Sequence, residues 1–508
     1  MAETLVQTDR GPVRGVVLDG IVRFLGIPYA AAPVGALRFR PPVAHGGWSE
    51  VRDSSQPGPS APHSVKPFPG LDVEPLIGSG WRKGDDYLNV NVWAPEGAAM
   101  SGSGSQAEGA APRPLRPVMV WVHGGGFVLG SNHAAIQDGS AFARSGIVCI
   151  AINYRMGVEG FLPIPGVPTN LGLRDILFAL EWVRENAPAF GGDPANVTVF
   201  GESAGAMAIA DLMTSPLARG LFRRAIVQSG HGAMVRPIPV AQRLVRKLAK
   251  ILKVSPDEAG FRSASAEACV AAVEKVSLPT SRIDLRDDEG REPVFGISRF
   301  VPVHGDDVLP EKPLDALAKG AGAEVELLIG TNAEEMNLYL VPTGVRDRIG
   351  SLLAWYVLGR SQPAARKVLK AYGLGVRGRK PGQALTDAMN DLVFRWPARR
   401  FAEEHRGPTH FYEFDWRSPA FGGELGASHG MELPFVFDTL ASVTGQEGLA
   451  GTDPPQALAG RIHRLWVGFA IDGRLPWPEY DRETRQVYRL GKGEAVHEPP
   501  MPAAEFLP

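Results

Sequence analysis

The clearest chemical signal in the sequence is a serine held between two glycines. A β-branched run, VTVF, leads into GESAG at residues 201–205, and an apolar, helix-like run follows. In the pattern G-x-S-x-G the serine occupies a strained turn between a strand and a helix, where larger neighbours would collide with packed backbone. The turn directs the hydroxyl towards solvent, so the pattern predicts Ser203 as a nucleophile for acyl transfer. A glycine-rich turn that merely contains a serine is the alternative interpretation.

A second signal is a run of three glycines upstream of this serine. The segment WVHGGGF places His123 after a strand-like run and before Gly124, Gly125 and Gly126. Successive glycines leave backbone N–H groups open to a ligand. In acyl transfer such donors stabilise the negative oxygen of the tetrahedral intermediate, and losing one costs about 3 kcal/mol. We therefore expect Gly125 and Gly126, with the N–H of Ala204, to form an oxyanion hole, although a glycine triplet alone is more typical of an ordinary loop.

These residues need a scaffold, and the sequence indicates a mostly parallel sheet. Apolar runs suited to buried strands recur at residues 117–122, 147–153, 197–200, 224–229, 325–330 and 409–415. The segment 171–187 has helical spacing, because its apolar residues share one face: Leu173, Ile176, Leu177, Leu180 and Val183. Alternating strands and helices predict a parallel sheet covered on both sides.

The remaining segments predict a loop and helical insertions around one large domain. Residues 96–114 are rich in Gly, Ser and Ala without an apolar period, so we expect a surface loop there. Residues 240–290 and 340–405 have helical spacing with little strand content, which suits insertions placed over a sheet as a lid or regulatory lobe. We expect residues 1–508 to form a single domain.

The composition is that of a soluble, folded protein. Hydrophobic residues make up 44% and charged residues 21% of the 508 residues. A formal net charge of −2, without a long basic run, argues against nucleic acid as a partner. No run reaches the roughly 18 apolar residues of a membrane helix, and residues 1–10 lack the pattern of a secretory signal. We expect a cytoplasmic protein that does not bind membranes.

The two cysteines fit neither a metal site nor a disulfide framework. Cys149 lies in an apolar run and Cys269 in an alanine-rich stretch. We interpret both as small core residues, with a single disulfide between them as the alternative.

Several ordered segments together resemble a known family. They are FLGIPYAAAPVGALRFRPP (24–42), DDYLNVNVWAP (85–95), HGGGF (123–127), residues 170–206, LFRRAIVQSG (221–230), GTNAEEM (330–336) and GASHGMELPFVF (426–437). Over most of its length the chain resembles the type-B carboxylesterases, which include cholinesterases and bacterial para-nitrobenzyl esterases. The resemblance implies the α/β-hydrolase fold, a large mostly parallel sheet flanked by helices, with helical insertions over the active site. It also implies hydrolysis of carboxylic esters by a Ser, Glu, His triad.

The histidine of such a triad must follow its acid along the chain. Serine needs an imidazole to take its proton, and the imidazole needs a carboxylate to fix its tautomer. The order in this fold is nucleophile, acid, histidine. Six of the eleven histidines satisfy that order: His304, His405, His410, His429, His463 and His497. His429 matches the family's His-Gly pattern, so we expect it to be the base, with a solvated loop histidine as the alternative.

The acid is expected at Glu335, which follows the strand-like run 325–330 and lies where the family has its catalytic glutamate. Glu334 is the competitor, because Met336 stands where the family usually has glycine and the shape of the loop is therefore less certain. Asp306 and Asp307 also precede the histidine but look like a turn.

Three departures from the family pattern bear on structure and specificity. Tyr87 stands where the family usually has a cysteine, so the first disulfide of secreted relatives should be absent. Ala206 replaces the commoner glycine after the serine motif, either tightening helix packing or the pocket floor or being tolerated as a small residue. Phe127 and the aromatic residues between 390 and 440 are expected mostly in the core, some of them lining an acyl or alcohol pocket.

The expected activity is hydrolysis of small-molecule esters through an acyl-enzyme. A carbamate, an amide or a polyester fragment could serve the same residues, and a non-catalytic binding protein is a further alternative. The resemblance implies no metal or organic cofactor. With an ordinary histidine pKa near 6.5, turnover should fall below about pH 6 to 7. We expect a monomer or a homodimer.

Overall fold

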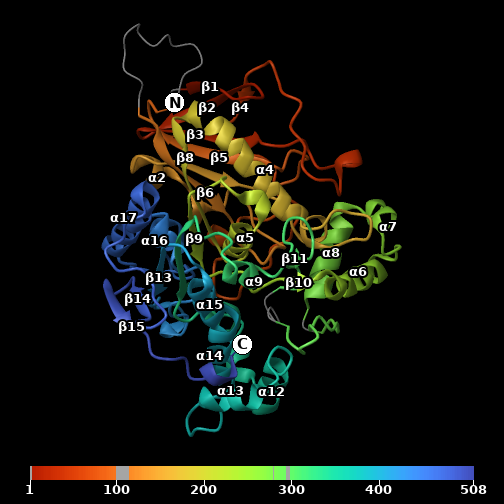
Figure 1. Ribbon diagram of the computed structural model, residues 1–508, viewed down its shortest axis with the longest axis vertical. Coiled ribbons are helices and arrows are strands. Elements are labelled where there is room, and N and C mark those ends of the chain that lie inside the picture. Colours follow the sequence, from red (N-terminus) through yellow and green to blue (C-terminus); the bar gives the residue numbers. More distant parts are fainter. Residues whose placement is uncertain (1–2, 99–113, 279, 293–297, 508) are drawn as a thin grey trace.

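One large sheet runs through the molecule (Figure 1). A computed structural model describes residues 3–98, 114–278, 280–292 and 298–507, so most of the loop expected at 96–114 lies outside the described residues. Among the described residues the sheet has thirteen strands. They are β1 Glu3–Gln7, β2 Pro12–Leu18, β3 Ile21–Pro28, β4 Arg52–Asp53, β5 Asn89–Pro95, β6 Arg116–Val122, β7 Val148–Ile152, β8 Gly192–Glu202, β9 Arg224–Gln228, β12 Glu326–Asn332, β13 Thr409–Phe414, β14 Gln486–Arg489 and β15 Glu494–His497. A separate parallel pair joins β10 (Arg236–Pro237) to β11 (Val303–His304).

The centre of the sheet is parallel and its margins are largely antiparallel. Every pairing from β7 through β6, β8, β9, β12 and β13 to β14 is parallel. The strands β1, β2, β3, β5 and β7 pair antiparallel, β15 is antiparallel to β14, and the short β4 is parallel to β2. The six apolar runs expected to be strands correspond to β6, β7, β8, β9, β12 and β13, so that prediction is confirmed.

The central strands are apolar throughout because both faces of the sheet are covered. In β6, Val118, Val120 and Val122 pack in one hydrophobic core, whereas Met119 and Trp121 pack in the other, and all five are completely buried. Successive side chains of a strand point to opposite faces, so a strand buried on both sides needs apolar residues at every position.

Helices flank the sheet and fill the connections between its strands (Figure 1). They are α1 Glu74–Ile77, α2 Ser140–Arg144, α3 Gly157–Phe161, α4 Leu171–Asn186, α5 Ala204–Met213, α6 Ile238–Leu252, α7 Glu258–Ser263, α8 Ala266–Ser277, α9 Pro313–Ala318, α10 Asn337–Leu340, α11 Val345–Arg348, α12 Ser351–Leu358, α13 Ala365–Ala371, α14 Pro381–Asn390, α15 Trp396–Glu404, α16 Leu433–Val436 and α17 Gln456–Asp472. A π-helical turn, Asp391–Arg395, joins α14 to α15. The helix α4 confirms the element expected at 171–187, and it buries the expected apolar face.

The two segments expected to be helical insertions are helical. The helices α6, α7 and α8 occupy the first segment, and α11 to α15 occupy the second. Figure 1 shows α6 to α8 beside the sheet, and α12 to α14 at the end of the molecule away from β1. Their role as a lid and the single-domain organisation stay predictions.

The structure also bears on the expected disulfide pattern and on the expected absence of membrane helices. Cys149 and Cys269 are both buried and free, so the alternative of a disulfide between them is wrong. Tyr87 is buried, and its hydroxyl donates to Oε2 of Glu159 over 2.9 Å. In the described part of the chain, no helix is long and apolar enough to cross a membrane.

Candidate active site

Ser203 occupies the turn between β8 and α5 with a strained backbone. Its φ of 54° and ψ of −123° are disfavoured for a residue that carries a Cβ. The flanking glycines make this turn possible. A Cβ on Gly201 would lie 2.7 Å from the carbonyl oxygen of Val122, and one on Gly205 would lie 2.0 Å from the same atom. Close packing of this turn against β6 therefore explains why both neighbours are glycine.

Glu335 and His429 come together from two loops that follow neighbouring parallel strands. Glu335 lies after β12 and His429 lies after β13, and Oε2 of the glutamate is 2.6 Å from Nδ1 of the imidazole. The other carboxylate oxygen accepts the backbone N–H of Asn332 over 2.8 Å. Glu335 is completely buried. This arrangement can hold the imidazole in one orientation and tautomer.

The neighbouring carboxylate, Glu334, points elsewhere. Its Oε2 accepts the backbone N–H of Ala427 over 2.9 Å, and its Oε1 pairs with Arg417 on the surface. Among the two competing acids, Glu335 is therefore the one in contact with the imidazole.

The other imidazole nitrogen faces the cavity that contains Ser203. Glu202, Ser203 and His429 line one cavity of about 170 Å³. Nε2 of His429 lies 2.9 Å from Oε1 of Glu202. This ion pair occupies the nitrogen, and among the described residues no hydrogen bond joins it to the Ser203 hydroxyl. The serine and the histidine share a cavity, and Glu202 pairs with the imidazole nitrogen that faces it.

The carboxylates around His429 favour its protonated form. Burial by itself lowers the pKa of His429, but Glu202, then Tyr339 and Glu335, outweigh burial, so this pKa lies well above its usual value of 6.5. The expectation based on an ordinary histidine pKa therefore needs correction. Tyr339 lies over the same cavity, and its ring centroid is 5.6 Å from that of His429. Burial raises the pKa of Tyr339 to about 12.

The glycine loop lines the same cavity as the imidazole, and two of its residues have backbone conformations that favour glycine. Gly125 has a φ of 107° and Gly126 a φ of 61°, and both line the cavity with Ser203. A Cβ on Gly125 would lie 2.0 Å from the carbonyl oxygen of Leu129. Ala204 is the first residue of α5, so its N–H has no acceptor within the helix. The role of Gly125, Gly126 and Ala204 as an oxyanion hole stays a prediction.

No metal centre is evident: the described ranges contain no group of three or more His, Cys, Asp or Glu side chains that could hold a metal ion.

Comparison with known proteins gives the family. Residues 2–503 match the model of the Carboxylesterase family. The chain belongs to this carboxylesterase family. The para-nitrobenzyl esterase of Bacillus subtilis (strain 168) is 33% identical over 98% of this chain and 97% of its own. The phenmedipham hydrolase of Pseudarthrobacter oxydans is 32% identical over 96% of this chain and 95% of its own.

Solved structures of carboxylesterases share the fold. The carboxylesterase of Geobacillus stearothermophilus has a TM-score of 0.79 and 31% identity, and the match covers 98% of both chains. The predicted α/β-hydrolase fold is confirmed, and so is the predicted resemblance to the para-nitrobenzyl esterases. The protein is a carboxylic-ester hydrolase.

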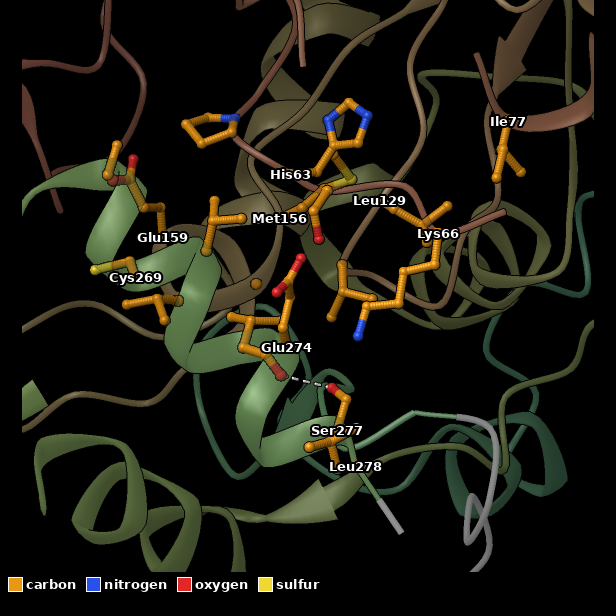
Figure 2. Close-up of a pocket in the computed structure, with 18 of the residues that line it drawn as sticks. His63, Lys66, Ile77, Leu129, Met156, Glu159, Cys269, Glu274, Ser277 and Leu278 are labelled. Carbon is orange, nitrogen blue, oxygen red and sulfur yellow. Dashed lines mark hydrogen bonds between the residues drawn. The ribbon is translucent and has the colours of Figure 1, made fainter. Parts of the chain in front are cut away.

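The walls of this carboxylesterase cavity come partly from residues that the sequence did not indicate. Phe68, Leu76 and Ile77 line it from the segment around α1, and Tyr339 lines it from α10. Ile77 also lines the larger neighbouring cavity of Figure 2. No motif marks these residues, because they reach the cavity only through the folding of long loops.

The aromatic residues expected near the pocket contribute less than anticipated. Phe127 is buried in the core against Phe161, with ring centroids 4.5 Å apart. Phe435 packs on Phe414 and Trp416. Phe394, in the π-helical turn, packs on the imidazole of His429 with ring centroids 4.7 Å apart. Within the range 390–440, the cavity walls include His429 and Leu433 but no aromatic residue other than the imidazole.

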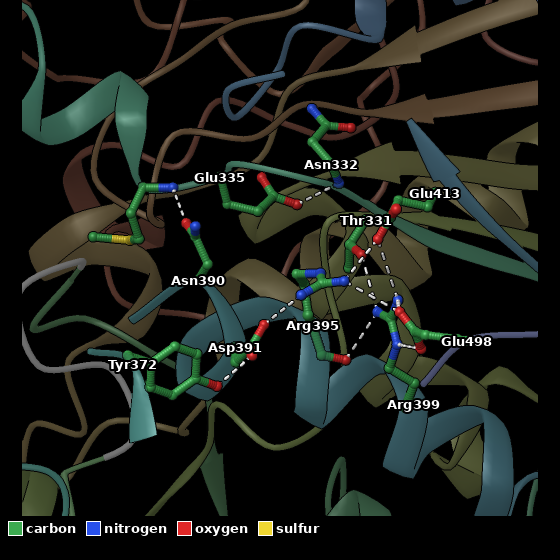
Figure 3. A network of polar contacts seen from close by, with 11 residues as sticks. Thr331, Asn332, Glu335, Tyr372, Asn390, Asp391, Arg395, Arg399, Glu413 and Glu498 are labelled. Carbon is green, nitrogen blue, oxygen red and sulfur yellow. Dashed lines mark hydrogen bonds and ion pairs between the residues drawn. The ribbon is translucent and has the colours of Figure 1, made fainter. Parts of the chain in front are cut away.

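A polar network holds the acid loop where the family usually has glycine (Figure 3). The backbone N–H of Met336 donates to Oδ1 of Asn390, at the end of α14, over 2.7 Å. Further along the same helical segment, Nη1 of Arg399 donates to the hydroxyl of Thr331 over 3.1 Å, just before the loop. Arg399 also pairs with Glu498, its Nε donating to Oε2 over 2.6 Å. The acid loop is therefore held by contacts from α14 and α15, one of them through the backbone N–H of Met336.

A third buried carboxylate lies beside the candidate site. Glu432 accepts from Gln228 over 3.1 Å and from the side chain of Asn332 over 2.6 Å. Burial, together with the charges of Glu202 and Glu335, raises the pKa of Glu432 to about 8. The side chain of Asn332 also donates to the carbonyl oxygen of Ser428 over 2.7 Å. Asn332 thus ties the acid loop to the histidine loop.

Proposed function

We propose that the protein cleaves carboxylic esters through an acyl-enzyme formed on Ser203. His429 acts as the base and Glu335 orients it. The observation that carries the proposal is the 2.6 Å contact between Glu335 and His429 beside the cavity that contains Ser203. Nucleophile, base and orienting acid are the three groups that acyl transfer of this kind requires.

The reaction has two halves. Ser203 attacks the ester carbonyl while Nε2 of His429 takes its proton, and the N–H groups of Gly125, Gly126 and Ala204 stabilise the oxyanion. His429 then protonates the leaving alcohol, and water repeats the sequence to release the acid. The hydrogen bond between Nε2 and the serine hydroxyl forms as substrate binds, since such contacts often tighten only in the enzyme–substrate complex.

A covalent inhibitor tests the nucleophile. An organophosphate that carries a p-nitrophenolate leaving group should add once to the parent protein, as seen by intact mass. Ser203→Ala should abolish the adduct and reduce hydrolysis of p-nitrophenyl acetate by roughly 10³-fold or more. Ser351→Ala, an exposed serine at the start of α12, is the matched control and should behave as the parent. Parent-like turnover or labelling by the Ser203→Ala variant would exclude this mechanism.

Esters are favoured as substrates over carbamates, amides and polyester fragments. The support is the description of the family and the name of the Bacillus relative, both of which specify an esterase. The same support favours an enzyme over a non-catalytic binding protein. A panel of esters and carbamates with one fixed leaving group separates these substrate classes.

We also propose a cytoplasmic location and a monomer or homodimer that acts on small molecules without a nucleic-acid partner. Cell fractionation tests the location. Light scattering on the eluting protein gives the number of subunits.

A further inference from the structure

A second cavity, larger than the one that contains Ser203, lies next to it (Figure 2). Its volume is about 400 Å³, compared with about 170 Å³ for the catalytic cavity. The larger volume falls within the range of ligand pockets, roughly 300 to 1,000 Å³, whereas the catalytic cavity alone is too small for a bulky ligand. A substrate with a large remote group therefore needs space beyond the catalytic cavity.

The two cavities share walls. Phe68, Ile77, Val128 and Leu129 line both of them. Val128 and Leu129 lie two and three residues after Gly126, which lines the catalytic cavity, so the shared wall lies close to the expected oxyanion hole. A ligand whose reacting carbonyl lies at Ser203 can thus extend past these residues into the larger cavity.

One face of helix α8 forms the far wall. Its residues at the cavity are Ala266, Cys269, Val270, Val273, Glu274 and Ser277. This spacing of three and four residues places them in a single stripe along the helix. Figure 2 shows α8 on one side of the cavity and the side chains of His63, Met156 and Leu129 on the other.

The opposite wall is shaped by a glycine. Gly157 has a φ of 54°, a backbone conformation that residues other than glycine rarely adopt. A Cβ at this position would lie 3.4 Å from Cγ2 of Val273. A side chain at position 157 would therefore touch Val273, and the glycine keeps this part of the cavity wider by about one methyl group.

The charges on the walls balance. Lys66 and Glu274 carry opposite charges and both line the cavity. The third ionised group, Glu159, is already satisfied by Nε of Arg38, 3.0 Å away, and by the hydroxyl of Tyr87. The remaining walls are largely aliphatic, including Val128, Met156 and Val270. Such a cavity favours an uncharged, apolar occupant, because an ion would lose its hydration without a net counter-charge.

We propose that this cavity is a subsite for a bulky, uncharged apolar group of the ester, remote from the bond that is cleaved. The proposal rests on the function proposed above, and it names Val273 as a specificity-determining residue. The remote group belongs either to the acyl part or to the alcohol part of the ester, and the test has one arm for each.

The test compares a bulky with a small ester on variants of α8. The measured quantity is the ratio of kcat/KM for the bulky ester to kcat/KM for p-nitrophenyl acetate. The acyl arm uses p-nitrophenyl cyclohexanecarboxylate, and the alcohol arm uses 1-naphthyl acetate against phenyl acetate. Val273→Trp fills the cavity and should reduce the ratio about tenfold or more in at least one arm. Val273→Ala enlarges the cavity and should not reduce the ratio.

Ala271→Trp is the matched control, because Ala271 lies on the exposed face of the same helix. Its ratio should equal that of the parent in both arms. An unchanged ratio for Val273→Trp in both arms, or an equal fall for Ala271→Trp, would overturn the proposal. The arm that responds identifies which side of the ester occupies the subsite. Failure of the proposed function is distinguishable, since it would appear as full turnover by the Ser203→Ala variant with every ester.

Discussion

At the scale of single residues, the charge of Glu202 sets the working pH range of the imidazole. His429 can accept a proton only when it is neutral, so kcat/KM should rise as pH increases through its pKa. Burial lowers this pKa, but Glu202, Tyr339 and Glu335 raise it by more than burial lowers it, so the pKa of His429 lies well above 6.5. The acid limb of the profile should therefore lie at higher pH than the range of about 6 to 7 expected for an ordinary histidine.

Removing that charge gives a prediction with a definite sign. Glu202→Gln should lower the pKa of His429 and move the acid limb of kcat/KM to lower pH, as measured with p-nitrophenyl acetate over a series of buffers. Glu334→Gln is the matched control, because Glu334 pairs with Arg417 rather than with the imidazole. An acid limb at the same pH in the parent and the Glu202→Gln variant would contradict this account.

The sequence predicted three of the residues that meet at the candidate site, but not their electrostatics. Ser203, Glu335 and His429 were found because each lies in a recognisable motif, and their catalytic roles stay predictions. Glu202 is part of the same motif as Ser203, so it was visible in the sequence, yet its 2.9 Å approach to Nε2 depends on the fold. Tyr339 had no signal at all, since it follows the acid loop without a motif of its own.

At the scale of elements, the turn between β8 and α5 tolerates no side chain at either glycine. We predict that Gly205→Ala lowers the free energy of unfolding by more than about 2 kcal/mol, because its Cβ would lie 2.0 Å from the carbonyl oxygen of Val122. Urea unfolding followed by fluorescence measures the change. Gly46→Ala is the control, since no atom lies within 4 Å of a Cβ there. A Gly205→Ala variant as stable as Gly46→Ala would show that the turn can relax.

The prediction of elements succeeded where burial is strongest. The central strands were predicted because burial on both faces makes each a continuous apolar run. The outer strands β1 and β2 are only partly buried, so they lacked such a run and were missed. The π-helical turn Asp391–Arg395 was also missed, because one extra residue per turn leaves the helical spacing of its neighbours almost unchanged.

At the scale of the whole molecule, Arg399 joins parts of the chain that are far apart in sequence. It is almost completely buried, and it contacts Thr331 at the end of β12 and Glu498 near the end of the chain. Burial raises the pKa of Glu498, but Arg399 and Arg395 outweigh it and hold that pKa below its usual 4.5. The ion pair thus stabilises the fold above that pH, and the contribution is lost as pH falls through the lowered pKa.

Breaking this pair should destabilise the fold. Arg399→Met should lower the free energy of unfolding by about 3 to 5 kcal/mol at neutral pH, because it leaves a buried carboxylate without its main partner. The difference from the parent should shrink in acid, where Glu498 takes up a proton. Arg400→Met removes a partly exposed pair with Glu404 and should cost about 1 kcal/mol or less. Urea unfolding of the parent and the two variants, at neutral and at acid pH, gives the loss of stability for each variant and its change with pH. Equal losses for the two variants would contradict the role given to Arg399.

The position of Glu498 also has a consequence for synthesis on the ribosome. Arg395 and Arg399 are made 103 and 99 residues before this carboxylate. Both arginines share two carboxylates, Glu413 and Glu498. A nascent chain that stops short of Glu498 therefore carries two cations that lack one of these two shared partners, beside the strand that leads to Glu335. Full charge pairing next to the acid loop therefore waits until residue 498 has been synthesised.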